Sequence, residues 1–423
     1  MSTTEAVRAH YDKFPYPTVV NLAVPRPVAH RRRRLSYLLG RRKETAIPPD
    51  ARIWVAGCGT QQAAHWGMSF PEGRVLATDL SHEVLQRAQG LADALGLAHV
   101  RFAQHDLMTS PPENDAFDLV VSTGVIHHLP SPSTGLRHLR QALKADGALQ
   151  LMVYGTAQRA PLAAIRRATE LLAPPEMKPE ARYALAIDVL RATLAAEDTC
   201  APLGRAALEL LETYADNDPS FVADALLHPL EQTYDIDGLL ALLAEGGFRH
   251  QSWQQPALWQ LDGYLPDASA LVAQSHERPP KDQWRLVYAL SGLAAPLLEV
   301  LAVPAEAPPV APYAMEDLDA MPLQACSEAR VVAVKDGRPV GEVDVPALEL
   351  NGEQLVGRPA AGYGSPRGFR LPATVAPLLS ACDGTTTAGA LIERFAADLG
   401  KPAVYQTLGT LLPDDIGLLV PAW

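Results

Sequence analysis

Short apolar runs alternate with amphipathic stretches from residue 51 to about residue 155. Each run is rich in Val, Ile, Leu or Ala, and the stretch after it repeats apolar residues at helical spacing. Repeated β-α-β units of this kind predict a doubly wound, Rossmann-like α/β sheet with helices on both faces. The predicted strands are 52–56, 74–78, 100–103, 117–122 and 148–154, and the predicted helices are 62–68, 81–95 and 132–143.

The alternation stops after the fifth predicted strand. The next stretches have helical character only, and they are 160–172, 179–195 and 203–214. A helix at 236–245 and a strand pair at 248–259 then resume the sheet pattern. The block 156–228 is therefore predicted to be a helical insertion. An insertion at the carboxyl end of a strand is well placed to cover a ligand crevice.

The two ends of the chain are predicted as units outside this sheet. Helices are expected at 4–13 and 26–42, separated by Phe14-Pro15-Tyr16-Pro17, which cannot continue a helix. Near the other end, a hairpin is predicted at 330–345 around Asp336-Gly337. The predicted units are an N-terminal helical arm or lid, the α/β domain, a mostly helical segment with a Pro/Ala linker, and a small C-terminal α+β domain, at 1–45, 46–265, 266–325 and 326–423.

Composition and charge indicate which partners and which cellular compartment to expect. The chain has 423 residues and a net charge of −12, which disfavours nucleic acid because phosphate backbones are repelled. No apolar run is long enough to cross a bilayer, and residues 1–14 do not form a secretory signal. The four cysteines show neither metal nor disulfide spacing, so a cytoplasmic protein is expected. The basic stretches 31–34 and 41–43 indicate either a solvated helix face or a docking site for an acidic substrate.

Glycine and acidic residues follow the first three predicted strands. Gly57-Cys58-Gly59-Thr60 forms a turn where backbone amides can approach a ligand, although such turns are often purely structural. Asp79 lies about twenty residues further on, the spacing at which a carboxylate can bind both ribose hydroxyls of a nucleoside. Asp106-Leu107 ends the third strand, where a polar group can meet the exocyclic amine of adenine. An ordinary turn or helix cap is the structural alternative for both acids.

Two adjacent histidines, His127 and His128, follow the fourth predicted strand in the segment 122–130. Open α/β sheets bind ligands at this edge. Because adjacent side chains point in different directions, one histidine is expected to face the pocket and the other to be structural. No metal site is predicted, since no third histidine, cysteine or carboxylate stands at a supporting spacing.

Together these motifs resemble the class I S-adenosylmethionine-dependent methyltransferase family over roughly residues 51–259. The chain is also similar to a bacterial subgroup with a Tyr-x-x-x-Pro-Tyr-Pro arm, here Tyr11 to Pro17. The resemblance implies S-adenosylmethionine as the cofactor. Its implied contacts are Gly57, Gly59 and Thr60 with the methionine end, Asp79 and the neighbouring Leu80 with the ribose, Asp106 and Leu107 with adenine, and the segment from Thr123 to His128 with the methyl-transfer pocket.

Three positions near the glycine turn decide between S-adenosylmethionine and other cofactors, or depart from the family pattern. Val55 stands where the family usually has an acid, and Gln61 stands where it often has a third glycine. NAD is the competing cofactor, but its Gly-x-Gly-x-x-Gly/Ala turn would need a small residue at Gln62. S-adenosylmethionine is a sulfonium without a pyrophosphate, so Gln62 at this position does not count against its binding.

Candidate catalytic groups are drawn from the same edge of the sheet. His128 is the first candidate for a base and His127 the second, because a base is needed where the nucleophile must lose a proton. His228 lies where the insertion returns to the sheet, and Tyr154 ends the fifth strand. Tyr11, Phe14 and Tyr16 are predicted to close over the cofactor as an aromatic lid, with a hydrophobic staple of the N-terminal arm as the alternative. A structural role is the alternative for each histidine.

The resulting functional hypothesis is a methyltransferase acting on a small molecule such as a natural-product intermediate. A protein or peptide methyltransferase is the second hypothesis. In that case the C-terminal unit, which loosely resembles a winged-helix domain, would grip the polypeptide. That unit could equally support a homodimer. The third hypothesis is a non-catalytic scaffold that binds S-adenosylmethionine, and the departures at Val55 and Gln61 are its support.

Overall fold

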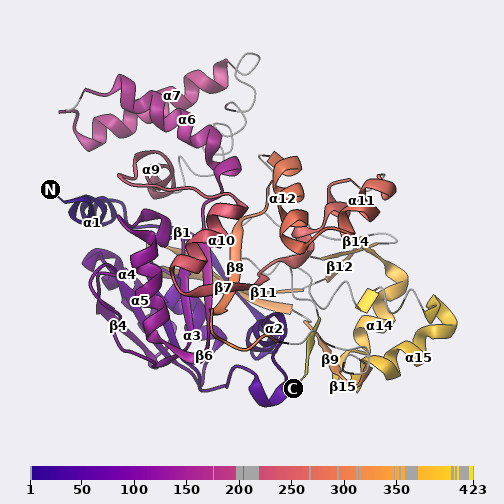
Figure 1. Ribbon diagram of the computed structural model, residues 1–423. Helices are drawn as coiled ribbons and strands as arrows, with labels where there is room; N and C mark the ends of the chain where they lie inside the picture. The colour runs from indigo at the N-terminus through magenta and orange to yellow at the C-terminus, as the bar shows by residue number, and fades with distance from the viewer. Residues whose placement is uncertain are drawn as a thin grey trace.

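A seven-stranded mixed sheet forms the centre of the protein (Figure 1). The structure, a computed structural model, describes residues 2–422 apart from several positions. These positions are 175, 197–202, 204–218, 266–267, 293–294, 311–312, 314–316, 318, 327, 347, 352–353, 358–369, 402–403, 405–406 and 409–418.

The strand order of this sheet is β4-β3-β2-β5-β6-β8-β7. Neighbouring strands pair in parallel from β4 to β6, and β8 runs antiparallel to both β6 and β7. The strands are β2 (Arg52–Ala56), β3 (Arg74–Asp79), β4 (Val100–Gln104), β5 (Phe117–Thr123), β6 (Leu143–Val153), β7 (Phe248–Trp253) and β8 (Leu298–Pro304).

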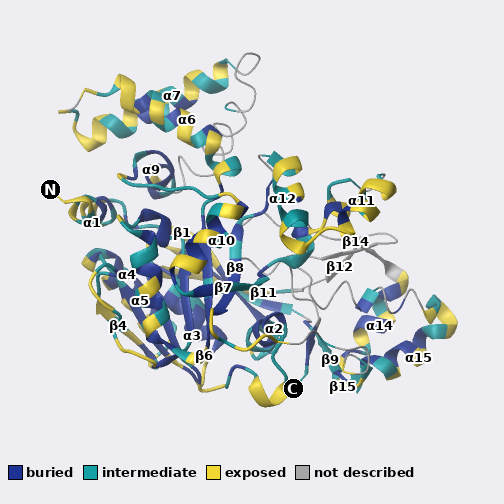
Figure 2. Cartoon of the chain, in the orientation of Figure 1, coloured by how far each residue is buried: buried dark blue, intermediate teal, exposed yellow. Residues whose placement is uncertain are grey.

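Helices cover both faces of the sheet, as the buried layer in Figure 2 shows. Strand β2 illustrates the pattern, because Trp54 packs into one apolar cluster and Ile53 and Val55 pack into the other. Side chains that alternate between two buried faces are typical of a central parallel strand. One face carries α2 (His30–Leu38), α3 (Gln62–Ser69) and α4 (His82–Ala94), and the other carries α5 (Pro132–Ala142), α10 (Ile236–Glu245) and α12 (Pro280–Ser291).

The predicted α/β core is confirmed. All five predicted strands are present, and so are the helices predicted at 62–68, 81–95, 132–143 and 236–245. Their ends agree within one residue, except that β6 begins at Leu143, five residues before the predicted start. The strand pair predicted at 248–259 is only half correct, because β7 is the one strand there and Pro256–Trp259 is a short 3-10 helix. Ser81 caps α4, since its hydroxyl accepts the Val84 amide.

The sheet continues further along the chain than the sequence pattern indicated. Residues 266–303 were expected to be mixed and mostly helical, and α11 (Ser269–His276) and α12 fit that expectation. Strand β8 does not, because it inserts between β6 and β7 as the antiparallel strand of the main sheet. Strand β8 is buried on both faces, and from Val300 to Val303 its residues are all apolar, a pattern that periodicity alone does not distinguish from a helix.

The N-terminal arm is only partly helical, which corrects the predicted helix at 26–42. Helix α1 (Thr3–Lys13) lies where it was predicted, but β1 (Val19–Arg26) is a strand, and α2 starts only at His30. Strand β1 pairs antiparallel with β10 (Glu328–Lys335), which forms the predicted hairpin with β11 (Arg338–Pro346). This three-stranded sheet packs Leu22 and Val332 against α3 and α4.

The insertion is helical, as predicted, and stands above the carboxyl edge of the sheet (Figure 1). It contains α6 (Thr156–Leu172), α7 (Pro179–Ala195) and α9 (Pro219–Leu227), which share an apolar cluster of their own. Of the predicted helix at 203–214, all but residue 203 lies outside the described residues.

A small C-terminal unit lies apart from the main sheet (Figure 1). Its three-stranded sheet has the order β15-β9-β16 and shares a separate apolar core with two helices. These elements are β9 (Pro322–Ala325), β15 (Asp383–Thr387), β16 (Leu419–Pro421), α14 (Ala376–Ser380) and α15 (Ala388–Leu399), and a further sheet is made by β12 (Leu348–Asn351), β13 (Gln354–Gly357) and β14 (Arg370–Pro372). The winged-helix resemblance of this unit stays a prediction.

The basic stretch around α2 joins parts of the fold. Arg34 donates to Gln254 at the end of β7, and Arg33 donates to Gln324 in the C-terminal unit. Arg42 stacks on Tyr313 and pairs with Asp317. These contacts are internal, so neither the solvated face nor the acidic docking site describes these three arginines. Among the described residues, no helix is both long and apolar enough to cross a bilayer.

Candidate active site

The turn after β2 has the backbone shape that only glycine adopts easily. Gly57 and Gly59 have φ angles of 75° and 52°. A Cβ on Gly57 would lie 2.4 Å from Cγ2 of Val125, and a Cβ on Gly59 would lie 3.2 Å from the carbonyl oxygen of Tyr16. Both glycines therefore meet a conformational and a steric requirement. The turn thus lies between β5 on one side and the N-terminal arm on the other.

Asp79 lies directly beside this turn. One carboxylate oxygen accepts the Gly59 amide at 3.0 Å, and the other accepts the Ser81 amide at 3.0 Å. Burial raises the pKa of Asp79, although these backbone hydrogen bonds oppose the shift. The Leu80 amide also lowers the pKa of this carboxylate. A carboxylate has about four lone-pair sites, so room is left for a further donor such as a ribose hydroxyl.

The N-terminal arm is fastened onto the same turn. The Thr60 hydroxyl donates to the carbonyl oxygen of Pro17, and the Thr60 amide donates to the carbonyl oxygen of Tyr16 at 3.3 Å. The Ser81 hydroxyl donates to Asp12 at 2.5 Å. Both donors of Thr60 are occupied in this way, so Thr60 holds the arm.

The remaining predicted cofactor residues line the adjoining strand ends. Asp106 accepts the Met108 amide at 2.8 Å, which is the turn interaction that was its structural alternative. Its segment adjoins Asp79, because the His105 amide donates to the Asp79 carbonyl oxygen. Three further carbonyl groups accept side-chain hydrogen bonds, and they belong to Leu80, Leu107 and Thr123.

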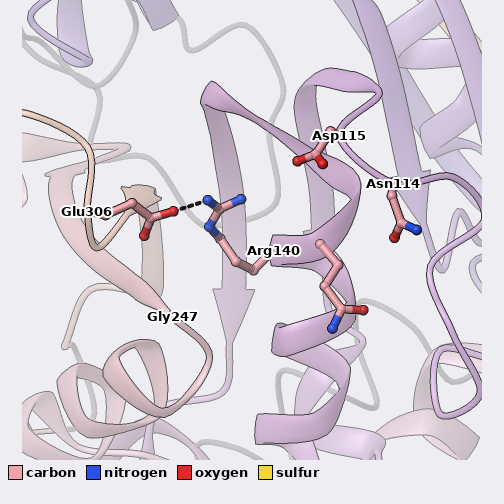
Figure 3. Close-up of a pocket in the computed structure, with 6 residues that line it drawn as sticks. Asn114, Asp115, Arg140, Gly247 and Glu306 are labelled. Atoms are coloured by element: carbon pink, nitrogen blue, oxygen red, sulfur yellow. Dashed lines mark hydrogen bonds and ion pairs between the residues drawn. The ribbon is translucent and has the colours of Figure 1, made fainter.

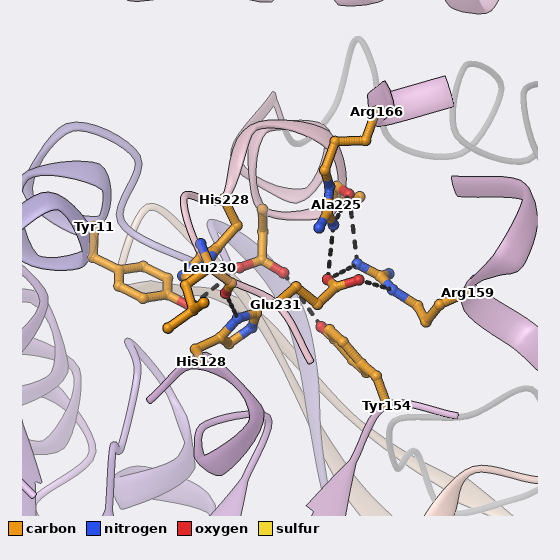
Figure 4. A network of polar contacts seen from close by, with 10 residues as sticks. Tyr11, His128, Tyr154, Arg159, Arg166, Ala225, His228, Leu230 and Glu231 are labelled. Carbon is orange, nitrogen blue, oxygen red and sulfur yellow. Dashed lines mark hydrogen bonds and ion pairs between the residues drawn. The ribbon is translucent and has the colours of Figure 1, made fainter. Parts of the chain in front are cut away.

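A buried cluster of aromatic and polar side chains lies between the arm, the sheet edge and the insertion (Figure 4). The ring centroids of His128 and His228 are 3.7 Å apart, and those of His127 and Tyr154 are 4.0 Å apart. Tyr11 lies 5.4 Å from His228. We call these five residues, together with Asp224, the histidine–tyrosine cluster. Four predicted catalytic residues and one predicted lid residue thus meet in one place.

The two adjacent histidines differ from expectation. His127 and His128 were expected to point to different surroundings, yet their ring centroids are only 4.2 Å apart and both are buried. The 3-10 turn Ile126–His128 brings the two rings to the same side. Successive side chains alternate cleanly only in an extended strand, which had already ended at Thr123.

Asp224 was missed as a site residue by sequence reasoning. Its two carboxylate oxygens accept the hydroxyl groups of Tyr11 at 3.2 Å and of Tyr154 at 3.3 Å. The detectable signal was its position four residues before His228, because residues at that spacing share a helix face. Asp224 lies on α9, so its carboxylate links this helix of the insertion to Tyr11 of the arm and to Tyr154 of the sheet edge.

Burial keeps the histidines of the cluster neutral. Burial lowers the pKa of His128 to about 4 and the pKa of His228 to about 2, and the neighbouring His128 lowers the pKa of His228 further. It also lowers the pKa of His127 well below its ordinary value. Burial and the Asp224 carboxylate raise the pKa of Tyr11 and of Tyr154. At neutral pH, the cluster therefore contains neutral imidazoles and neutral phenols.

A buried ion-pair group supports the cluster from the insertion side (Figure 4). Glu231 accepts from Arg159 at 2.5 Å and from Arg166 at 2.8 Å, and its side chain is only 2% exposed. Although burial raises it, the two guanidinium groups bring the pKa of Glu231 below its ordinary value. The Arg159 guanidinium also lies 4.1 Å from the ring centre of Tyr154.

A third potential metal ligand is present, contrary to the sequence argument. The ligand atoms of His128, Asp224 and His228 all lie within 4.8 Å of one another. The two rings are too close to share an ion, since imidazoles bound at about 2.1 Å and at right angles have centroids roughly 4.5 Å apart or more. The observed separation is 3.7 Å, and the phenols already occupy both Asp224 oxygens. This geometry suits a neutral hydrogen-bonding group better than a cation.

A separate open pocket lies at the opposite edge of the sheet (Figure 3). It adjoins the amino ends of β5, β6 and β7 and contains the ion pair of Arg140 with Glu306. Ligands of open α/β sheets bind at the carboxyl edge, so this pocket is outside the site. It is lined by Asn114, Asp115, Arg140, Gln141, Gly247 and Glu306.

Comparison with known proteins agrees with this fold. A family model described as a methyltransferase domain matches residues 54–151, which run from β2 into β6. An uncharacterised protein of Synechococcus is 27% identical over 293 residues, which cover 68% of this chain and 68% of that protein. The malonyl-[acyl-carrier protein] O-methyltransferase of Halalkalibacterium halodurans is 29% identical over 136 residues. That match covers 31% of this chain and 48% of the relative.

A solved structure extends the likeness of fold along nearly the whole chain. PKMT2 from Rickettsia typhi in complex with AdoHcy has a TM-score of 0.60 and 15% sequence identity, covering 93% of this chain and 76% of that one. Together these matches support a class I S-adenosylmethionine-dependent methyltransferase. The protein is an enzyme, and S-adenosylmethionine is its cofactor.

Proposed function

We propose that this methyltransferase methylates a small molecule bound at the histidine–tyrosine cluster. The observation that carries the proposal is the burial of the acceptor side of the site. His127, His128, Asp224 and His228 are all less than 5% exposed, and α1 and α9 cover them. A small acceptor can be enclosed between these elements, whereas a folded polypeptide would need an open groove.

The proposed contacts of the cofactor lie around the turn after β2. In this proposal the methionine end lies against the backbone of Gly57 and Gly59, and the free lone-pair sites of Asp79 accept hydrogen bonds from the ribose. Asp106 and Leu107 follow His105, whose amide donates to the Asp79 carbonyl oxygen, and we propose that they contact adenine. Thr60 holds the arm, so that Tyr16 and Pro17 cover the turn. When bound, S-adenosylmethionine supplies an electrophilic methyl group on a sulfonium.

The side chains of the cluster position the acceptor and exclude water. Neutral imidazoles can take a proton from the acceptor, and in-line alignment is the main contribution expected from the rest of the pocket. The relative from Halalkalibacterium halodurans is named as a malonyl-[acyl-carrier protein] O-methyltransferase, so the name of that relative describes a small acyl group attached to a carrier protein. Methylation of a protein or peptide, and a role as a non-catalytic scaffold, remain the alternative hypotheses.

Calorimetry and a turnover assay test the proposal together. The full-length chain should bind both S-adenosylmethionine and S-adenosylhomocysteine. In a metabolite extract supplied with methyl-labelled S-adenosylmethionine, label should enter compounds that pass a small-pore filter. Label retained only in protein would contradict the small-molecule proposal, and binding without any transfer would favour the scaffold hypothesis.

A further inference from the structure

One backbone residue contacts both stacked histidines of the cluster. Nδ1 of His128 lies 2.7 Å from the carbonyl oxygen of Leu230, and the amide of Leu230 donates to Nδ1 of His228 at 3.2 Å. A carbonyl oxygen only accepts, so Nδ1 of His128 must carry the proton of that neutral ring. An amide nitrogen only donates, so Nδ1 of His228 must be bare and the proton of that ring lies on Nε2.

The two rings therefore present opposite groups to the site. His128 presents a bare Nε2, which is a hydrogen-bond acceptor and a base, while His228 presents Nε2–H, which is a donor. Both Nε2 atoms are buried, and neither has a hydrogen-bond partner within the part of the chain that the structure describes. Buried polar atoms without partners are costly, so this pair is complementary to a ligand that both donates and accepts.

We infer that the group methylated at this site is a hydroxyl, of an alcohol or a phenol. A hydroxyl donates its proton to Nε2 of His128, and one lone pair of its oxygen accepts Nε2–H of His228. The second lone pair stays available for attack. This inference rests on the proposed function and specifies its acceptor atom.

Other nucleophiles leave one member of the pair unsatisfied. A neutral amine has a single lone pair, which must attack the methyl group, so Nε2–H of His228 would have no acceptor. A carboxylate carries no proton, so Nε2 of His128 would face a second acceptor. The cost of such an unpaired buried group is on the order of 1–3 kcal/mol, which is about 5- to 140-fold in binding.

The transfer is balanced in protons and electrons. The hydroxyl oxygen forms a bond to the methyl carbon, and the carbon–sulfur bond breaks with its electron pair moving to sulfur. The hydroxyl proton moves to Nε2 of His128, which becomes a cation, and it then leaves to solvent when the product departs. The carboxylate of Asp224, held by Tyr11 and Tyr154, lies within 4.8 Å of both rings and stabilises that cation.

The assignment can be tested by nitrogen NMR of the full-length protein bound to S-adenosylhomocysteine. Histidine labelled with ¹⁵N reports which ring nitrogen carries the proton, and spectra of His128→Gln and His228→Gln assign the two rings. We expect His128 to be protonated at Nδ1 and His228 at Nε2. The same tautomer in both rings would overturn the inference.

Three probes with the same ring then test the class of acceptor. Phenol should shift the Nε2 resonance of His128, whereas aniline and benzoate should not. With phenol as the acceptor, His128→Gln should lower methyl transfer by at least 100-fold, the low end for loss of a general base. His276→Gln is the matched control, since that side chain is 54% exposed.

The outcomes separate this inference from the function on which it rests. No shift with phenol, or an equal shift with aniline or benzoate, would overturn the hydroxyl assignment. If S-adenosylmethionine binding and methyl transfer to another small acceptor persist, the proposed function stands without it. If neither is detected, the proposed function itself fails.

Discussion

The carboxylate of Asp79 connects three parts of the site at the scale of a single residue. It accepts one amide from the glycine turn and one from the start of α4, and its remaining lone pairs are available to a ligand. Hydrogen bonds to a charged carboxylate are stronger than those between neutral groups. The residue can therefore hold the turn and a ribose at once.

Asp79→Ala should weaken the binding of S-adenosylmethionine at least tenfold, about 1.4 kcal/mol, because charge-assisted hydrogen bonds to the ribose are lost. Calorimetry of the folded variant measures the effect. Asp93→Ala is the control, since that exposed acid lies on α4 away from the turn. Unchanged affinity in Asp79→Ala would remove Asp79 from the ribose role.

Gly57→Ala should destabilise the fold, since the new methyl group would lie 2.4 Å from Val125 and the φ angle is 75°. We expect a loss of at least 1–2 kcal/mol, the approximate cost of a left-handed conformation for an L-residue. Gly90→Ala is the contrasting control. Gly90 lies within α4 with no atom near its Cβ position, so that change should stabilise by roughly 0.5–1 kcal/mol. Urea unfolding compares the two, and equal effects would contradict the account.

At the scale of elements, the segment after α9 joins the insertion to the sheet. The amide of Gln232 donates to the His127 carbonyl oxygen, and the amide of Tyr234 donates to that of Tyr154. Glu231 directly precedes Gln232 and pairs with Arg159 and Arg166 of α6. The position of His228 over His128 therefore depends on backbone bonds and on one buried carboxylate.

Glu231→Gln should destabilise the protein by about 3–5 kcal/mol, because two buried guanidinium groups would lose their counter-charge. Thermal unfolding measures this loss. Glu170→Gln, which removes an exposed partner of Arg167 on the same helix, should change stability by less than about 1 kcal/mol. A small effect at Glu231 would show that the ion pair does not hold the insertion.

At the scale of the whole molecule, several histidines are buried in their neutral form. Burial lowers the pKa of His128 and that of His250 to about 4, from 6.5. The unfolded chain binds more protons than the folded one below pH 6.5, so stability falls as the pH falls. The free energy of unfolding keeps its full value above pH 6.5, and near pH 4 it has fallen by roughly 3 kcal/mol for each of these two histidines.

Urea midpoints between pH 7.5 and pH 4.5 should therefore decrease steadily below pH 6.5. His276→Gln should leave this dependence unchanged, because that histidine is exposed. A midpoint that stays constant from pH 6.5 to pH 5 would indicate that the buried histidines are already charged.

The sequence was sufficient for features with a local signal. Strands such as 52–56 and 117–122 are buried on both faces and flanked by turns, so their periodicity and their ends predicted them. Strands β1 and β8 could not be found in this way, since the partner of each is distant in the chain. Asp224 was missed for a related reason. Its partners Tyr11 and Tyr154 are 213 and 70 residues away.

The pairing of β1 with β10 has a consequence for synthesis of the protein. The residues that cover the glycine turn leave the ribosome first, but Val19 pairs with Lys335 and Arg26 with Glu328. Domains generally fold as units from the N-terminus during translation. The main sheet ends at Pro304, so a nascent chain can complete it before the partner of β1 exists. We therefore expect the enzyme to acquire its closed cofactor cover late, after residue 335 has emerged.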